Sequence, residues 1–161
     1  MALEAPIELW VPGVPIPQGS MKAFVRPHPQ QIRSGMTGRG LCYGGQGYAS
    51  ITSDNDKLKE WRAHVTAIAI RVRARFGQVV IDEPCELHAT FFLPRPTGTP
   101  KHVLYPVKRP DLDKLMRAIG DSLEAAGMIT SDSFFVNEIL YKRFAPTREQ
   151  VGVAITLRAV V

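Results

Sequence analysis

Three aspartates lie near one another in the second half of the chain. Asp111 and Asp113 are separated by one leucine, and Asp132 follows within the turn-like stretch Thr-Ser-Asp-Ser. Carboxylates held side by side repel one another, and a hard cation such as Mg²⁺ relieves that repulsion because it prefers oxygen ligands. Such a cation activates water and stabilises the charge that develops on a phosphodiester during hydrolysis. The residue types therefore indicate metal-dependent phosphoester chemistry.

A helix predicted over residues 111–127 decides which of these groups can meet. At 100° per residue, Arg117 lies about 40° from Asp113 around the helix axis, and Asp121 lies about 80° from it. Lys114, at about 100°, must bend around the helix to reach the acids. An apolar stripe occupies the opposite side: Leu112, Leu115, Met116, Ile119 and Leu123. We expect Asp113 and Arg117 to share a face that points away from the core, with Arg117 placed to bind a phosphate.

Each acid also has an ordinary structural explanation. An aspartate at a helix start accepts backbone N–H bonds and complements the helix dipole, which would account for Asp111. Asp113 and Arg117, four residues apart, would form a common surface ion pair, and Asp132 suits a polar turn. The combination of several acids, a nearby cation and flanking basic loops favours a nuclease over these explanations.

The positive charge of the chain is unevenly distributed. The net charge is +5, and the isoelectric point is near 9.5. Residues 18–50 contain four basic residues and no acid, and residues 95–109 contain four more, again without an acid. Segregated positive charge of this kind is typical of proteins that bind nucleic acids. The candidate DNA-binding residues are Lys22, Arg26, Lys101, Lys108 and Arg109.

The hydrophobic pattern predicts a single α+β domain over residues 1–161. Alternating apolar residues indicate strands, and apolar residues spaced by three and four indicate helices. The expected strands are 7–11, 87–93, 136–144 and 151–159, and the expected helices run from Ser53 or Asp54 to about Phe76 and over 111–127. This order fits a mixed sheet covered by two main helices and joined by basic loops. The glycine-rich stretch from Arg33 to Gly47 is expected to form a flexible flap or a hairpin.

Composition and cysteine content indicate what kind of protein this is and in which compartment it is expected. With 45% apolar and 22% charged residues, the chain is expected to be globular. No apolar run approaches the roughly 18 residues of a membrane helix, and the first eleven residues do not resemble a signal peptide. Two cysteines without metal-ligand spacing are typical of a reduced, cytoplasmic protein. Because no phosphate-loop motif is present, no nucleotide cofactor is expected.

The acidic stretch and two further segments resemble a known family. Residues 109–123, followed by Gly127-Met128-Ile129 and Asp132, are similar to the central motif of the RusA-type Holliday-junction resolvases. The proline- and glycine-rich stretch 12–20 is similar to the opening of phage members of that family, and Tyr141-Lys142-Arg143 to a strand that ends in a basic residue. The resemblance spans most of residues 7–145 in order.

The resemblance implies an endonuclease that resolves four-way junctions and other branched DNA in recombination and repair. It implies a homodimer that nicks paired strands symmetrically with Mg²⁺, for which Mn²⁺ can substitute. The family's site residues fall on the following positions: the metal-binding acids on Asp111, Asp113 and Asp132, the catalytic lysine on Arg117, and a further frequent acid on Asp121.

Three departures from the family pattern bear on activity. Arg117 replaces the catalytic lysine, keeping the charge but not readily donating a proton. Lys114 stands where the family usually has asparagine, so it is a rival for the catalytic cation. Ser131 replaces the first acid of an Asp-Asp pair, which leaves fewer carboxylates for the metal. These departures keep open an alternative function, a branched-DNA-binding module with weak or lost nuclease activity. The long basic loops disfavour a third, a phosphoesterase acting on small substrates.

Overall fold

The computed structural model describes residues 5–19, 22–26, 48–52 and 56–160. Contacts divide the chain into two compact units, one made of residues 1–18 and 56–161 and the other of residues 19–55. The flap expected between Arg33 and Gly47 lies outside the described residues. That the whole chain forms one domain stays a prediction.

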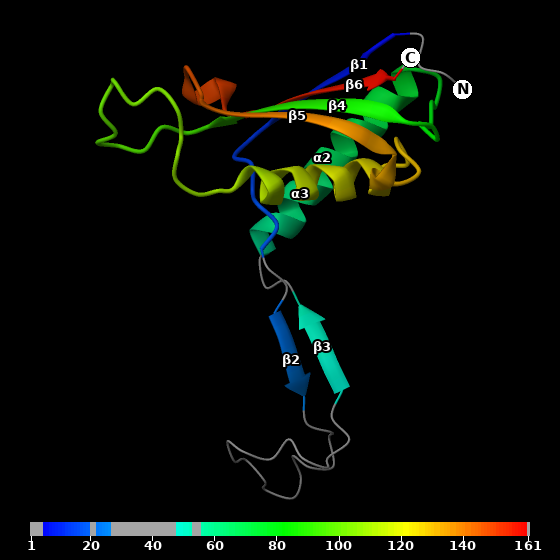
Figure 1. Cartoon of the computed structure of the whole chain (residues 1–161), viewed down its shortest axis with the longest axis horizontal. Helices are drawn as coiled ribbons and strands as arrows, with labels where there is room; N and C mark the ends of the chain where they lie inside the picture. The colour runs from blue at the N-terminus through cyan, green and yellow to red at the C-terminus, as the bar shows by residue number, and fades with distance from the viewer. Residues whose placement is uncertain (1–4, 20–21, 27–47, 53–55, 161) are drawn as a thin grey trace, which may run out of the picture. The chain divides into compact units, whose positions relative to one another are not determined.

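The larger unit is built on a four-stranded mixed sheet with the order β1-β6-β4-β5 (Figure 1). The strands are β1 (Ile7–Pro12), β4 (Cys85–Leu93), β5 (Phe135–Phe144) and β6 (Gly152–Ala159). β1 and β4 run antiparallel to β6, whereas β4 and β5 are parallel. Parallel neighbours need a long crossover, and here it contains helix α3 (Leu112–Ala125). All four predicted strands are confirmed, with ends that differ by one or two residues.

One face of the sheet carries the apolar core. Every second residue of β4, from Cys85 to Leu93, is buried, because successive side chains of a strand point to opposite faces. The register sets Ile155 of β6 between Leu9 of β1 and Ala89 of β4, so that the buried positions form continuous rows across the sheet. The predicted alternation of apolar residues therefore specifies which face of the sheet carries the core.

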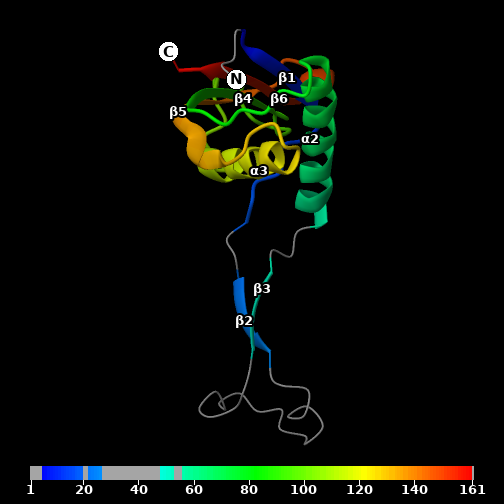
Figure 2. The ribbon, with the colours of Figure 1, turned by 90° about the vertical axis from the view of Figure 1, so that its right-hand side faces the viewer.

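Helices α2 (Asp56–Arg75) and α3 lie on the same face of the sheet and cross one another (Figures 1 and 2). The buried stripe of α2 consists of Leu58, Trp61, Val65 and Ala69. The predicted apolar stripe of α3 is buried except for Leu112, which is partly exposed. The α+β class with two covering helices is confirmed. Within the described ranges, neither helix has the length and apolar character needed to cross a membrane.

The smaller unit contains an antiparallel pair of strands, β2 (Lys22–Arg26) and β3 (Tyr48–Thr52). Lys22 and Arg26, two of the candidate DNA-binding residues, are the first and last residues of β2. Their backbone pairs with Thr52 and Tyr48.

The loop from Pro94 to Pro110 carries the chain from β4 to α3. Prolines occur throughout it, and they exclude regular helix or central-strand structure. Its end is attached to the sheet by Lys142 of β5, whose Nζ donates hydrogen bonds to the carbonyls of Lys108 (3.0 Å) and Pro110 (2.8 Å). This anchor fixes the start of α3 relative to β5.

Candidate active site

A pocket of about 210 Å³ lies between α3, the short 3₁₀ turn η1 (Asp132–Phe134) and β5. We call it the acidic pocket. Its lining consists of Asp113, Met116, Arg117, Gly120, Asp132, Phe135 and Glu138. Three carboxylates and one guanidinium thus line one small hollow, and they come from α3 and from the continuous η1–β5 segment that follows it.

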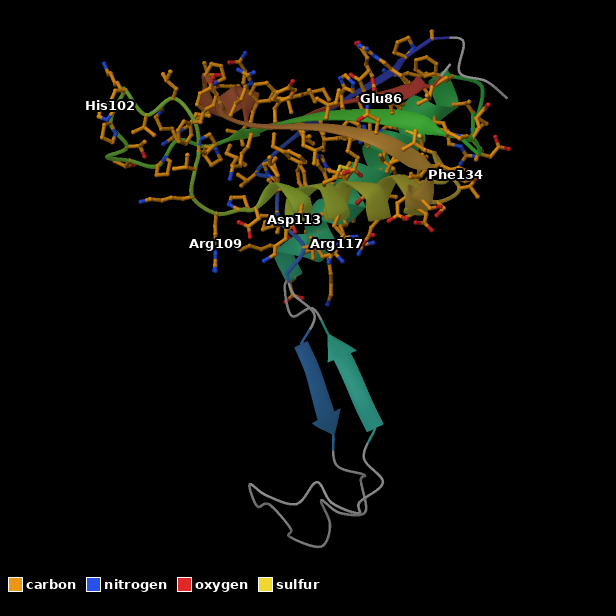
Figure 3. The ribbon with its side chains drawn as sticks, viewed as in Figure 1. Glu86, His102, Arg109, Asp113, Arg117 and Phe134 are labelled. Atoms are coloured by element: carbon orange, nitrogen blue, oxygen red, sulfur yellow. The ribbon has the colours of Figure 1, made fainter. Side chains whose placement is uncertain are left out.

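Helix α3 supplies its residues to the acidic pocket by simple periodicity. Asp113, Arg117 and Gly120 are spaced by four and three, so they stand in one row along the helix. Figure 3 shows Asp113 and Arg117 projecting from the same side of α3. Both side chains are exposed, whereas Ile119 and Leu123 are buried in the core. The amphipathic pattern of the helix is therefore what turns this acid and this cation outward together.

Gly120 of α3 lies beside the turn that carries Asp132. A Cβ placed on Gly120 would lie 3.7 Å from the Cβ of Asp132, in ordinary van der Waals contact, and would occupy part of the hollow. The turn itself is capped by Ser131, whose Oγ accepts a hydrogen bond from the backbone N–H of Ser133 (3.2 Å). The serine that replaces a family acid thus orders the turn that holds Asp132.

Glu138 is a pocket residue that the sequence reasoning missed. It lies on β5 opposite Leu87, a buried residue of β4, and it therefore points to the helix side of the sheet. Burial raises the pKa of the Glu138 carboxyl, and the negative charge of Asp132 raises it further. The signal was available, because strand alternation puts this acid on the same face as Leu140 and Phe144.

Two acids singled out by sequence lie outside the pocket lining. Asp111 is the N-cap residue of α3, but its side chain makes no capping hydrogen bond. Its half-exposed carboxylate pairs instead with Lys114 at 3.4 Å. Asp121 is turned toward α2, where it pairs with Arg62 at 3.2 Å. Of the two rival cations, Lys114 is engaged by Asp111, while Arg117 lines the acidic pocket.

The predicted DNA-binding residues fall in both units. Lys101, Lys108 and Arg109 are exposed on the loop before α3, and Arg109 projects on the same side as Asp113 and Arg117 in Figure 3. Among the described residues, none of these three loop cations forms an ion pair. Their charge is therefore available to a phosphate backbone.

The donor atoms of the acidic pocket suit a hard cation. Asp113, Asp132 and Glu138 present carboxylate oxygens, which Mg²⁺ and Mn²⁺ prefer. Across the described ranges, no three His, Cys, Asp or Glu side chains are gathered closely enough to hold an ion by themselves. Mg²⁺ usually keeps several waters and takes one or two carboxylates together with substrate phosphate oxygens. Asp113 and Asp132, on two elements that face one pocket, fit such an incomplete protein shell.

A family model covers the part of the chain that builds this pocket. Residues 37–157 match the model of the endodeoxyribonuclease RusA, a range that contains α3, η1 and most of the sheet. No single curated protein matches the chain. Because the match extends over well more than half of the sequence and includes every residue that lines the acidic pocket, the chain belongs to the RusA endodeoxyribonuclease family.

Proposed function

We propose that this protein resolves four-way DNA junctions by Mg²⁺-dependent phosphodiester hydrolysis at the acidic pocket. The observation that carries the proposal is the meeting of Asp113 and Arg117 of α3 with Asp132 of η1 around one hollow. These residues are distant enough in sequence that local structure alone does not bring all three together. Their types are the ones that hydrolysis of a phosphodiester needs.

Asp113 and Asp132 are the proposed metal ligands from the pocket lining. Asp111, which pairs with Lys114 outside that lining, is included as a third ligand because the family resemblance implies it. When bound, the cation supplies an activated water and charge stabilisation at the scissile phosphate. Glu138 adds negative charge beside Asp132, and this favours a cation at the pocket because like charges otherwise repel. Mn²⁺ has the same ligand preferences and is expected to substitute.

Arg117 is the proposed phosphate-binding cation. It lies one turn from Asp113 and lines the pocket, so its guanidinium can donate paired hydrogen bonds to a phosphate held there. Because an arginine does not deprotonate, its role is to stabilise charge and orient the phosphate rather than to transfer a proton. Lys114 is a weaker candidate, since Asp111 already engages its ammonium group.

Branched DNA is the proposed substrate, and a homodimer is the proposed assembly. The exposed loop cations Lys101, Lys108 and Arg109 offer charge for the phosphate backbone near the start of α3. A four-way junction has two-fold symmetry, so paired nicks require two acidic pockets related by a two-fold axis. Symmetric nicking follows from that arrangement, and DNA recombination and repair are the processes in which we propose that it acts.

The experiment is cleavage of a synthetic four-way junction with Mg²⁺, under single-turnover conditions. Asp111→Asn, Asp113→Asn and Asp132→Asn should each abolish cutting, while junction affinity stays equal or rises because a negative charge near phosphate is removed. Asp121→Asn is the matched control, because Asp121 pairs with Arg62 away from the pocket. It should cut at close to the wild-type rate.

Two results would overturn the assignment. Full cutting by any two of the three variants Asp111→Asn, Asp113→Asn and Asp132→Asn would remove the acids from the site. A wild-type protein that binds the junction tightly but does not cut it with Mg²⁺ or Mn²⁺ would instead identify a branched-DNA-binding module without nuclease activity.

A further inference from the structure

The loop between β4 and α3 lines a second cavity, separate from the acidic pocket. We call it the loop pocket. Its volume is about 620 Å³, and its walls are mostly proline and other apolar groups. They include Tyr105 and Val107 of the loop, Leu93 and Phe144 at the ends of β4 and β5, and Val14. The volume lies within the range of about 300–1,000 Å³ that is typical of small-molecule sites.

Specific contacts hold the loop that forms the loop pocket. The Arg95 guanidinium donates hydrogen bonds to the carbonyls of Pro100 (3.3 Å) and Val103 (3.1 Å). The central guanidinium carbon of Arg95 also lies over the Phe144 ring, 4.2 Å from its centroid, in a cation–π contact. At the other end, Lys142 ties the loop to β5. The pocket is therefore shaped before any ligand arrives, which lowers the entropy cost of binding.

The lining of the loop pocket combines apolar surface with positive charge. Tyr105 is 57% exposed and Val107 is 84% exposed, although both border a hollow that would shelter them if it were filled. Lys108 and Arg109 also line the cavity and are exposed. The loop from 94 to 110 contains no acid. A fitting ligand therefore has an apolar face and carries negative charge.

We propose that the loop pocket binds one unpaired nucleotide of branched DNA. Its base packs against Tyr105 and Val107, and its phosphate lies beside Lys108 and Arg109. That the ligand is DNA rests on the proposed function. A nucleotide is the part of DNA that joins a flat apolar face to an anion, and stacking of a base on an aromatic ring is favourable whatever the base.

The pocket selects an unpaired nucleotide because a paired base is stacked on both faces within the duplex. Taking a base out of the stack costs least where it is already unpaired, as at an imperfect branch point. Arg109 precedes Asp113 by four residues, and the two side chains project on the same side in Figure 3. A nucleotide held at Arg109 therefore places the adjoining strand near the acidic pocket.

The test uses a four-way junction that carries one unpaired 2-aminopurine at the branch point, with EDTA present so that no cleavage occurs. Emission of 2-aminopurine changes when the base leaves the stack, and anisotropy of a dye on a distant arm gives the affinity. Val107→Trp should fill the loop pocket. Leu104→Trp is the matched control, because Leu104 is 67% exposed on the same loop but does not line the cavity.

We expect the wild type and Leu104→Trp to change the 2-aminopurine emission and to bind this junction more tightly than a fully paired one. Val107→Trp should abolish the emission change and weaken binding by about tenfold, the size of effect that one lost base stack produces. Equal behaviour of the two tryptophan variants would overturn the proposal. So would a Val107→Trp protein that binds normally but has a changed mass in light scattering, which would make a second copy of the chain the occupant.

Cleavage of the same junction with Mg²⁺ separates this inference from the proposed function. Cutting without base entry would overturn the role of the loop pocket alone. Base entry without cutting would support the loop pocket and overturn the proposed nuclease activity alone.

Discussion

Replacing Gly120 with alanine should stabilise the protein and slow DNA cleavage. Gly120 lies within α3, where glycine costs about 1 kcal/mol relative to alanine. The added Cβ would lie 3.7 Å from Asp132 and 3.9 Å from the nearest atoms of Met116 and Phe135, which is ordinary van der Waals contact. Because no neighbour must move, we expect the free energy of unfolding to rise by about 0.5–1 kcal/mol and the unfolding midpoint by roughly 1–4 °C.

The same methyl group should impair the acidic pocket. It would enter the hollow beside Asp132, in the row of α3 residues that includes Asp113 and Arg117. Small displacements of reacting groups cost up to about 10²-fold in rate, so we expect single-turnover cleavage to slow by about tenfold. A Gly120→Ala variant that is more stable but cuts more slowly would show that Gly120 serves to leave space in the acidic pocket and does not stabilise the helix.

Gly127→Ala is the control with the opposite expected sign. Gly127 has φ +63°, a conformation that L side chains rarely adopt, and its added Cβ would lie 2.9 Å from Nη1 of Arg73. That nitrogen donates a hydrogen bond to the carbonyl of Ala126. We expect a loss of about 1–2 kcal/mol with an unchanged cleavage rate for the folded protein, because Gly127 does not line the acidic pocket.

Urea unfolding without divalent metal measures both stability changes, and single-turnover cleavage of a four-way junction measures the rates. The reasoning is refuted if Gly120→Ala loses more than about 1 kcal/mol, since the distances and helix propensity then fail to predict the sign. It is also refuted if Gly120→Ala is stable and cuts at the wild-type rate.

Three further predictions concern the catalytic cation, pH and assembly. Arg117→Lys should keep or raise activity and Arg117→Ala should lose on the order of 10²-fold in single-turnover rate, whereas Lys114→Ala should stay near wild type; the reverse pattern would give the role to Lys114. A hydrogen bond from His88 holds the pKa of Glu86 below its usual value, so the stability that Glu86 contributes is present above the ordinary glutamate pKa and is lost as pH falls through the lowered one. Glu86→Gln should therefore melt earlier than wild type at pH 7, with a difference that shrinks in strong acid, and a gap that widens on acidification would contradict this. Light scattering at micromolar concentration should give the mass of a dimer, and a fully active monomer would exclude the proposed two-fold assembly.

Much of the fold could be predicted because its signals are local. The alternation of apolar residues in β4 follows from the geometry of a single strand, and the stripe of α3 follows from the geometry of a single helix. For the same reason, the sequence alone placed Asp113 and Arg117 together on one outward face. The family resemblance rests on residues within and around that same helix, and the family match includes them.

Only the tertiary structure decided which acids share the pocket, because that depends on how separate elements pack. Asp132 lies beside Gly120 because η1 packs against α3, and Glu138 enters from β5 because the parallel crossover sets that strand beside β4. Helical geometry places Asp121 near the face of α3 that carries Asp113, but its carboxylate forms an ion pair with Arg62 of α2. The spacing of residues along one helix determines which side chains lie on the same face. Long-range packing determines which partner each of them meets, and no local pattern encodes that choice.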